Sequence, residues 1–335
     1  MNTISIYSRE DIARFINKRT GETKYGEVVK IIKELDDLKT SPATFVLLGI
    51  PEDIGVRANK GIPGTENAWQ TCLKSLLNVQ ANAYTHPEDV ILLGEIDCAK
   101  QIKEAEKLNK KDVNYFLELG KLVTRIDQNV TAIVELIVKA GKIPILIGGG
   151  HNNSYGNIKG TSRALQQSIN VINFDVHSDF RPLEHRHSGN GFSYAFEEGY
   201  LNKYYIFGLQ KNYTSQAIFD QLMEKENQIQ FALFENIMVR KINSFVHTLN
   251  EAETFVSGQK FGLEVDLDAI QNTPSSAITP SGFSVNQARR FVSFFGRNKN
   301  VTYLHLCEGL PVSDKDGQLG KLLAFLITDF TGKIS

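Results

Sequence analysis

The chain has 335 residues, of which 41% are hydrophobic and 22% are charged, and its formal net charge is −1. This balance is typical of a soluble globular protein, and neither sign of charge predominates, which argues against a nucleic-acid partner. Three cysteines are too few, and odd in number, for a disulfide framework, so a reducing compartment is expected. The N-terminal residues lack an apolar signal core, and no later apolar run could span a bilayer. These features predict a cytoplasmic protein without a nucleic-acid or membrane partner.

The first 40 residues predict a helical N-terminal extension. In the stretch SREDIARFIN, Ser8 stands two residues before an acidic residue, as a helix N-cap does. The stretch KYGEVVKIIKELDDLK carries apolar residues at helical spacing. Residues 41–335 are then expected to form a single domain, because no internal repeat or low-complexity linker interrupts them.

Short apolar runs recur along the rest of the chain and predict buried strands. They cover residues 44–50, 90–93, 143–147, 169–174, 204–209, 261–265 and 301–306. Helical periods lie between several of these runs, such as LVTRIDQNVTAIVELIVKAGK, which closes on Gly141. Buried strands that alternate with helices predict an α/β fold with a parallel sheet covered on both faces.

Polar clusters follow four of the predicted strands. GGGHNNSYG follows residues 143–147, DVHSDFR follows residues 169–174, EVDLDAI closes residues 261–265, and Glu308 follows the last run. In a parallel sheet the ligand site lies beyond the carboxyl ends of the strands. The sequence therefore brings polar side chains from four strand ends to one edge of the sheet.

These clusters contain enough ligands for two divalent metal ions. Residues two apart in an extended segment point the same way, so the acids and histidines of DVHSD can converge, as can the acids of EVDLD. Four negative charges would balance two divalent cations, with Asp175 and Asp266 as the carboxylates shared between them. The oxygen-rich set contains no cysteine and favours Mn²⁺ over Zn²⁺. The candidate ligands are His151, Asp175, His177, Asp179, Asp266 and Asp268.

Other interpretations of the same motifs are weaker. Glycines before a helix can bind phosphate through backbone N–H groups, but GGGHN lacks the Gly-Lys-Ser/Thr ending of a P-loop. A metallophosphoesterase would place Asp-x-His before its glycine–histidine elements, whereas GGGH comes first here. DxD alone also occurs in solvated loops, and a lone histidine after glycines is more often a turn residue than a ligand. It is the succession of all three motifs at strand ends that favours metal.

The order GGGH, DVHSD, EVDLD and CEGLP resembles that of the arginase–agmatinase–formimidoylglutamase family, the ureohydrolases, from about residue 44 onward. LLGIPEDIGV and LLGEID resemble the family's early strands and loops. The resemblance implies a three-layer α/β/α fold with a parallel central sheet. It also implies two Mn²⁺ ions per chain, with other divalent ions as an alternative. The ligands it implies are His151, Asp175, Asp179 and Asp266 for one ion, and Asp175, His177, Asp266 and Asp268 for the other.

The chemistry implied by this resemblance is hydrolysis of a C–N bond in a linear amidine or guanidine. The two ions would lower the pKa of a bound water, and Asp179 would orient that water and pass its proton to the leaving nitrogen. Glu308 would bind the cationic nitrogens of the substrate. Ser188 and Asn190, within the tripeptide SGN, match substrate contacts of the family, and Arg181 or Arg186 would be available for a carboxylate.

Three departures from the family pattern concern the substrate. Phe192 stands where arginases carry a proton-shuttling histidine. Formimidoylglutamases, like this chain, lack that histidine. Glu264 replaces the serine that precedes the DxD motif, and Gln271-Asn272 replaces an Asp-Pro pair. SGNGF therefore favours a formimidoylglutamase, which converts N-formimidoyl-L-glutamate and water to L-glutamate and formamide.

Two further functions stay open from the sequence. One is a urea-releasing agmatinase or arginase, and the other is a metal-binding homologue without efficient catalysis. The resemblance also leaves a homo-oligomer open, because members of the family commonly assemble as trimers or hexamers.

Overall fold

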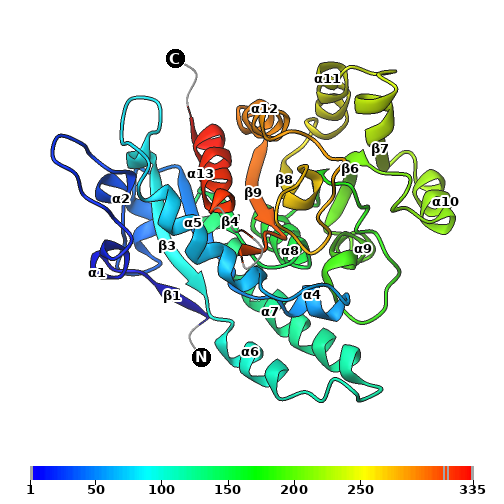
Figure 1. The fold of residues 1–335 in the computed structure, drawn as a ribbon, viewed down its shortest axis with the longest axis horizontal. Coiled ribbons are helices and arrows are strands. Elements are labelled where there is room, and N and C mark those ends of the chain that lie inside the picture. Colours follow the sequence, from blue (N-terminus) through cyan, green and yellow to red (C-terminus); the bar gives the residue numbers. More distant parts are fainter. Residues whose placement is uncertain (1–2, 312–313, 315–316, 333–335) are drawn as a thin grey trace.

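A nine-stranded sheet forms the centre of the protein, in a computed structural model that describes residues 3–311, 314 and 317–332 (Figure 1). The strand order is β1-β3-β2-β4-β9-β8-β5-β6-β7. Every neighbouring pair is parallel except β1 and β3, which are antiparallel. The strands are β1 Ile4–Ile6, β2 Phe45–Gly49, β3 Val90–Ile96, β4 Ile143–Ile147, β5 Ile169–Phe174, β6 Leu201–Leu209, β7 Ile229–Leu233, β8 Phe261–Asp266 and β9 Val301–Cys307.

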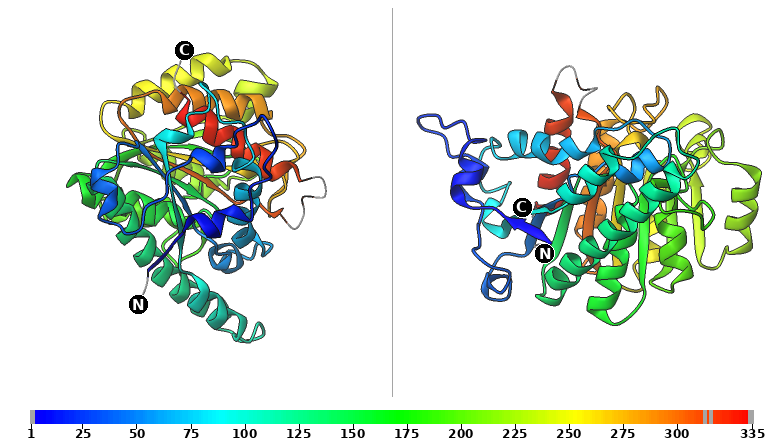
Figure 2. Two further views of the ribbon diagram at one scale, coloured as in Figure 1. Left: turned by 90° about the vertical axis from the view of Figure 1, so that its left-hand side faces the viewer. Right: turned by 90° about the horizontal axis from the view of Figure 1, so that it is seen from below.

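Helices cover both faces of this sheet, which confirms the predicted α/β/α architecture. Figure 2 shows α7 and α8 on one face and α12 and α13 on the other. The helices are α1 Arg9–Ala13, α2 Tyr25–Val28, α3 Asp37–Thr40, α4 Ile54–Ala58, α5 Ala68–Leu76, α6 Ala99–Glu106, α7 Tyr115–Lys139, α8 Asn153–Leu165, α9 Gly191–Glu197, α10 Gln216–Glu224, α11 Phe245–Val256, α12 Val285–Gly296 and α13 Gln318–Thr331. None of these helices is long and apolar enough to cross a membrane, as far as the described residues extend.

The central strands bury apolar side chains on both sides because each side meets a different helical layer. In β4, Ile145 and Ile147 join the core beneath α5 and α13, whereas Leu146 joins the core beneath α7 and α8. This alternation explains why the strands appear in the sequence as continuous apolar runs rather than as alternating patterns. The seven predicted strands are confirmed, and the runs 143–147 and 169–174 have the predicted bounds. β1 and β7, the two edge strands, were not predicted, and they are short.

The prediction for residues 1–40 is partly wrong. The helix expected for KYGEVVKIIKELDDLK forms only near its ends, at Tyr25–Val28 and Asp37–Thr40. Between them, Lys30 pairs with β3, since its backbone N–H donates to Val90 O and its carbonyl accepts from Leu92 N, both at 2.9 Å. These sheet hydrogen bonds compete with the helical ones, and tertiary pairing decides the conformation. The N-cap predicted at Ser8 is present, with a capping box to Asp11.

The strand order places the four predicted site strands next to one another. β4, β9, β8 and β5 are consecutive in the middle of the sheet, although they are far apart in the sequence. Their carboxyl ends therefore lie side by side, and the polar residues that follow them meet over a short stretch of the sheet edge.

Close packing of β2 against α5 gives the first prediction. A Cβ added to Gly49 would lie 2.4 Å from the buried ring of Trp69, the only tryptophan of the chain. We expect Gly49→Ala to lower the free energy of unfolding by about 1–3 kcal/mol, the range of an overpacked core. Urea unfolding followed by tryptophan fluorescence measures this change. Gly258→Ala is the control, because its added Cβ meets nothing within 4 Å. Equal stability of the two variants would contradict this account of the packing.

Candidate metal centre

A buried carboxylate holds the glycine turn that carries His151. Gly148 and Gly149 follow β4 with φ angles of 94° and 68°, which glycine adopts readily. Glu52 accepts hydrogen bonds from the backbone N–H of Gly150 at 3.0 Å and from Asn153 Nδ2 at 2.7 Å. A Cβ on Gly149 would lie 2.7 Å from this carboxylate, so the close approach requires glycine. Since Glu52 already binds the Gly150 N–H, this turn does not offer that donor to phosphate.

The first group of predicted ligands surrounds one nitrogen of His151. Its Nδ1 lies 2.9 Å from Asp179 Oδ2, 3.2 Å from Asp266 Oδ2 and 3.3 Å from Asp175 Oδ2. The imidazole is fully buried, and the geometry of these contacts does not suit a hydrogen bond from Nδ1. One nitrogen and three carboxylate oxygens thus converge on a common space, as ligands of one ion would.

The second group lies beside the first and shares Asp175 with it. His177 Nδ1 lies 3.1 Å from Asp268 Oδ2 and 3.6 Å from Asp175 Oδ1. Asp175 therefore directs one oxygen to each group, as expected of a shared ligand. Asp266 directs Oδ2 to the first group, while its Oδ1 accepts a hydrogen bond from the backbone N–H of Asp268 at 2.8 Å. The structure supports Asp175 as the carboxylate shared by both groups and places Asp266 with the first.

The electrostatics of these groups fit divalent cations. Burial raises the pKa of Asp266 well above its usual value, and the neighbouring Asp268 and Asp175 raise it further. Burial also raises the pKa of Asp268, to about 6, although His177 opposes the shift. Buried acids of like charge repel one another, and cations placed between them would remove this cost. His151 Nδ1 and Asp268 Oδ1 have no hydrogen-bond partner, so both are available as ligand atoms.

A pocket of about 460 Å³ opens above the two groups. Glu308 lies in its wall with a φ angle of 62°, and its Oε1 accepts a hydrogen bond from the backbone N–H of His151 at 2.8 Å. Burial raises the pKa of Glu308 well above its usual value, and Asp266 adds to the shift. The lining residues are Val56, Asn59, Gly61, His177, Ser178, Asp179, Arg181, Ser188, Tyr213, Ser215, Asp266, Asp268, Ser276, Ala277 and Glu308.

Three of the five predicted substrate contacts line this pocket, namely Glu308, Arg181 and Ser188. Arg181 and Ser188 are both held by Asn59, whose Oδ1 accepts from Arg181 Nη1 at 2.6 Å and whose Nδ2 donates to Ser188 Oγ at 3.0 Å. Asn59 was not predicted, because it comes from the distant β2–α5 connection. Tyr213 was also missed, and its ring lies 5.2 Å from that of His177. No motif marked either residue.

Arg186 and Asn190, which were predicted to contact the substrate, are buried and do not line this pocket. The Arg186 guanidinium is 5% exposed and forms an ion pair with Asp127 on α7, at 2.9 Å. It also donates to Asn190 Oδ1 and to the backbone carbonyl of Asn152, so its N–H groups are occupied by the protein. Asn190 is fully buried, and its Nδ2 donates to His185 O at 3.1 Å. A cation buried this deeply needs a partner, and Asp127 provides it.

Phe192 packs against the ring of His151 and does not line the pocket. The two rings meet edge to face with centroids 5.1 Å apart, and Tyr204 stacks on the other side of Phe192 at 4.4 Å. Phe192 is fully buried. The side chain at this position therefore packs a ligand in place and cannot transfer protons.

The two groups give the second prediction, which concerns metal content. We expect the wild-type chain to bind two Mn²⁺ ions, Asp175→Asn to lose both, and Asp268→Asn to lose mainly one, because only Asp175 contributes to both groups. Elemental analysis after dialysis against Mn²⁺ measures the ions per chain. Asp329→Asn is the control, since it removes the partner of Arg289 between α12 and α13, outside the ligand loops. Equal losses in Asp175→Asn and Asp268→Asn would contradict the shared ligand.

Metal binding should also stabilise the fold, which is the third prediction. A ligand that binds only the folded state at 100 times its Kd adds about 2.7 kcal/mol. We therefore expect Mn²⁺ to raise the Tm of the metal-free protein, and the rise to be lost in Asp175→Asn. Differential scanning calorimetry at several Mn²⁺ concentrations tests this, and a Tm that does not depend on Mn²⁺ would contradict it.

Comparison with known proteins agrees with the fold and with the order of the motifs. The sequence pattern of the arginase family matches residues 43–331. A formimidoylglutamase of Macrococcus caseolyticus is 26% identical over 211 residues, which cover 62% of this chain and 66% of that relative. One of Streptococcus pyogenes is 25% identical over 319 residues, covering 91% of this chain and 89% of that relative. The crystal structure of Trypanosoma cruzi formiminoglutamase with Mn²⁺ has a TM-score of 0.71 at 18% identity, covering 92% of this chain and 97% of that one. The chain belongs to the arginase family.

Proposed function

We propose that this protein is a metal-dependent hydrolase that converts N-formimidoyl-L-glutamate and water to L-glutamate and formamide. The observation that carries the proposal is the convergence of His151 Nδ1 with three carboxylates in the floor of a pocket that also contains Glu308 and Arg181. The family supplies the reaction class, and relatives named formimidoylglutamase or formiminoglutamase support the choice of substrate.

Two divalent cations would be held by His151, Asp175, Asp179 and Asp266 on one side, and by Asp175, His177 and Asp268 on the other. When bound, they supply the Lewis acidity that makes a water nucleophilic near neutral pH. The carboxylate-rich set suits Mn²⁺. The Trypanosoma cruzi formiminoglutamase was crystallised with Mn²⁺, which supports the same choice.

Glu308 is placed to bind the cationic end of the substrate. The His151 N–H holds Glu308 Oε1, which leaves Oε2 for a substrate nitrogen. A charged hydrogen bond of this kind orients the amidinium carbon above the acidic floor of the pocket. The left-handed backbone conformation of Glu308 turns its side chain out of the strand and toward the pocket.

Asp179 is placed to carry the proton from the attacking water to the leaving nitrogen. It lies in the pocket wall next to His151, and burial together with Asp175 raises the pKa of its carboxyl group. A carboxylate in contact with the attacking water can accept its proton and then release it to the departing amine.

Arg181 favours a substrate that carries a carboxylate. Among the described residues that line the pocket, it is the one arginine or lysine, and its side chain is half exposed at the mouth. Asn59 orients the guanidinium, whose remaining N–H groups can bind a carboxylate. Agmatine has no carboxylate to place there. We also propose that the reaction takes place in the cytoplasm, because Cys72, Cys98 and Cys307 are unpaired and buried.

The fourth prediction tests the role of Glu308. Glu308→Gln keeps the shape and the hydrogen bond to the His151 N–H but removes the charge that binds the substrate. We expect kcat/KM to fall. The decrease should correspond to a loss of about 1.5–3 kcal/mol of transition-state stabilisation, the scale of a charged hydrogen bond. Steady-state kinetics measures the loss, and elemental analysis should show unchanged Mn²⁺. Wild-type kinetics in the variant would remove Glu308 from the mechanism.

The fifth prediction tests the substrate itself. Wild-type protein loaded with Mn²⁺ should release formamide from N-formimidoyl-L-glutamate faster than urea from agmatine or arginine. Arg181→Met should raise KM for formimidoylglutamate, because it removes the carboxylate partner. The matched control is Arg290→Met, an exposed arginine on α12, which should change nothing. Faster turnover of agmatine by the wild type would favour an agmatinase, and no turnover of any substrate would favour a non-catalytic homologue.

A further inference from the structure

A row of buried polar side chains lies directly behind the ligands, on the sheet face covered by α7 and α8. Asn173 of β5 pairs with Glu264 of β8, and Glu264 pairs with His305 of β9. The flanking residues of β8 and β9 point into the opposite core, so these three side chains share one face. All three are fully buried. They lie near the carboxyl ends of their strands, one step below the ligand layer.

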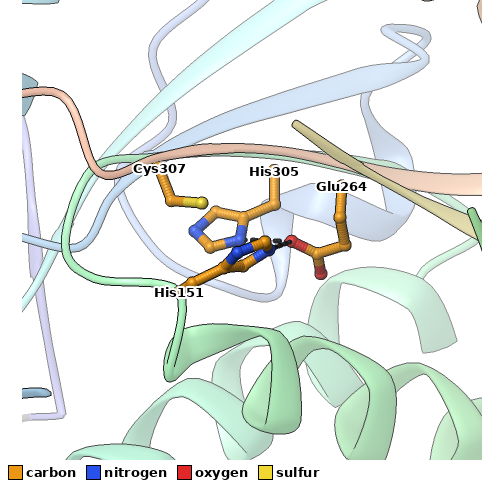
Figure 3. Close-up of side chains that lie close together, drawn as sticks. All are labelled: His151, Glu264, His305 and Cys307. Atoms are coloured by element: carbon orange, nitrogen blue, oxygen red, sulfur yellow. Dashed lines mark hydrogen bonds and ion pairs between the residues drawn. The ribbon is translucent and has the colours of Figure 1, made fainter. Parts of the chain in front are cut away.

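The Glu264 carboxylate faces two imidazoles, those of His305 and His151, as Figure 3 shows. Its Oε2 is 2.5 Å from His305 Nδ1 and 3.5 Å from His151 Nε2. The His151 ring is therefore held on both sides, with Nδ1 among the carboxylates of the first group and Nε2 toward Glu264. A neutral imidazole has one N–H, and the nitrogen that binds a metal must carry none. With Nδ1 facing the metal group, the proton belongs on Nε2, on the side of Glu264. The 3.5 Å separation is that of an electrostatic contact and not of a formed hydrogen bond.

The contact with His305 stabilises the buried carboxylate of Glu264. The second nitrogen of His305, Nε2, lies 3.4 Å from the carbonyl oxygen of Gly148, so both ring nitrogens face oxygen atoms. A neutral ring carries one N–H, and the shorter contact, to Glu264, favours Nδ1 as the donor. An unpaired buried carboxylate would be costly, and the contact with His305 compensates it.

Cys307 forms a cluster with His151, Glu264 and His305, and this cluster could be mistaken for a third metal site. Two contacts argue against a cation there. Glu264 and His305 touch directly at 2.5 Å, which leaves no room for an ion between them. The Cys307 thiol lies 3.6 Å from Val265 O and donates to that carbonyl, so it keeps its proton.

We propose that Glu264 is a positioning residue that orients His151 for metal binding, and that His305 acts through Glu264 by holding its carboxylate in place. The ligand role of His151 rests on the proposed function. Carboxylates that accept the second N–H of a metal-bound histidine fix its tautomer and ring orientation, and their loss typically weakens metal binding about 10- to 100-fold. The neighbouring Asn173 serves Asp175 in a parallel way, since its Nδ2 donates to Asp175 Oδ2 at 2.9 Å.

The test is a double-mutant cycle read out by Mn²⁺ affinity. Glu264→Gln, His305→Gln and the double variant are titrated with Mn²⁺ by isothermal calorimetry, starting from metal-free protein. We expect Glu264→Gln to lower the affinity for the ion that His151 would bind by about 10- to 100-fold. His305→Gln should weaken it as well, and the double variant should resemble Glu264→Gln alone, because both changes break one chain of contacts. Additive losses would overturn the role assigned to His305.

Controls separate orientation from general stability. Asp329→Asn breaks the ion pair with Arg289 between α12 and α13, outside the ligand loops, and should leave the Mn²⁺ affinity unchanged whatever its effect on the Tm of the metal-free protein. Glu264→Gln with wild-type affinity would overturn the inference, whereas a wild-type protein that binds no Mn²⁺ would overturn the proposed function instead. Tryptophan fluorescence shows whether Glu264→Gln folds. If it does not, His305→Gln alone tests the inference, because this change releases the Glu264 carboxylate from its partner. Unchanged affinity in that variant also overturns the inference.

Discussion

The grouping of four acidic side chains around two imidazoles is the constraint on which the rest of this structure depends. Asp175 and Asp266 are almost completely buried, and each lies close to other acids of the same charge. Carboxylates removed from water lose hydration, and like charges add repulsion, so the protein alone compensates them poorly. Two divalent cations would balance the four charges. The apolar strands beneath provide a rigid base, and the loops above provide a pocket in which that charge can act on a substrate.

Buried polar contacts hold the ligand loops at the required positions. Glu52 joins the loop after β2 to the glycine turn after β4, since it accepts hydrogen bonds from Ile54 N, Gly55 N and Gly150 N. Burial raises the pKa of Glu52, but these N–H groups oppose the shift and can solvate its charge. Glu308 links the ends of β9 and β4 in the same manner, through the His151 N–H. The metal groups therefore sit on backbone that is fixed by carboxylates which are not themselves in the groups.

The two arginines of the loop after β5 lie in different surroundings, one buried in the core and one half exposed at the pocket. Arg186 is buried against Asp127 and lies between the rings of Tyr155 and Tyr194, so it anchors the loop to α7 and α8. Arg181 keeps a half-exposed side chain at the pocket. Anchoring one end of the loop fixes the other, which gives Arg181 and Ser188 defined positions without burying them in the core.

By itself the sequence determined the sheet class, seven of the strands and the six candidate ligands, because buried strands and their polar ends leave local patterns. The pairs two residues apart, such as Asp175 and His177, follow from strand geometry alone. Other features depended on tertiary structure. Only the strand order shows that β4, β9, β8 and β5 are neighbours, and only burial separates Arg186 from Arg181, two arginines in the same loop. The Glu264–His305 contact joins residues 41 positions apart, and neither forms a motif by itself. Long-range pairing decides such contacts, and a local pattern carries no record of it.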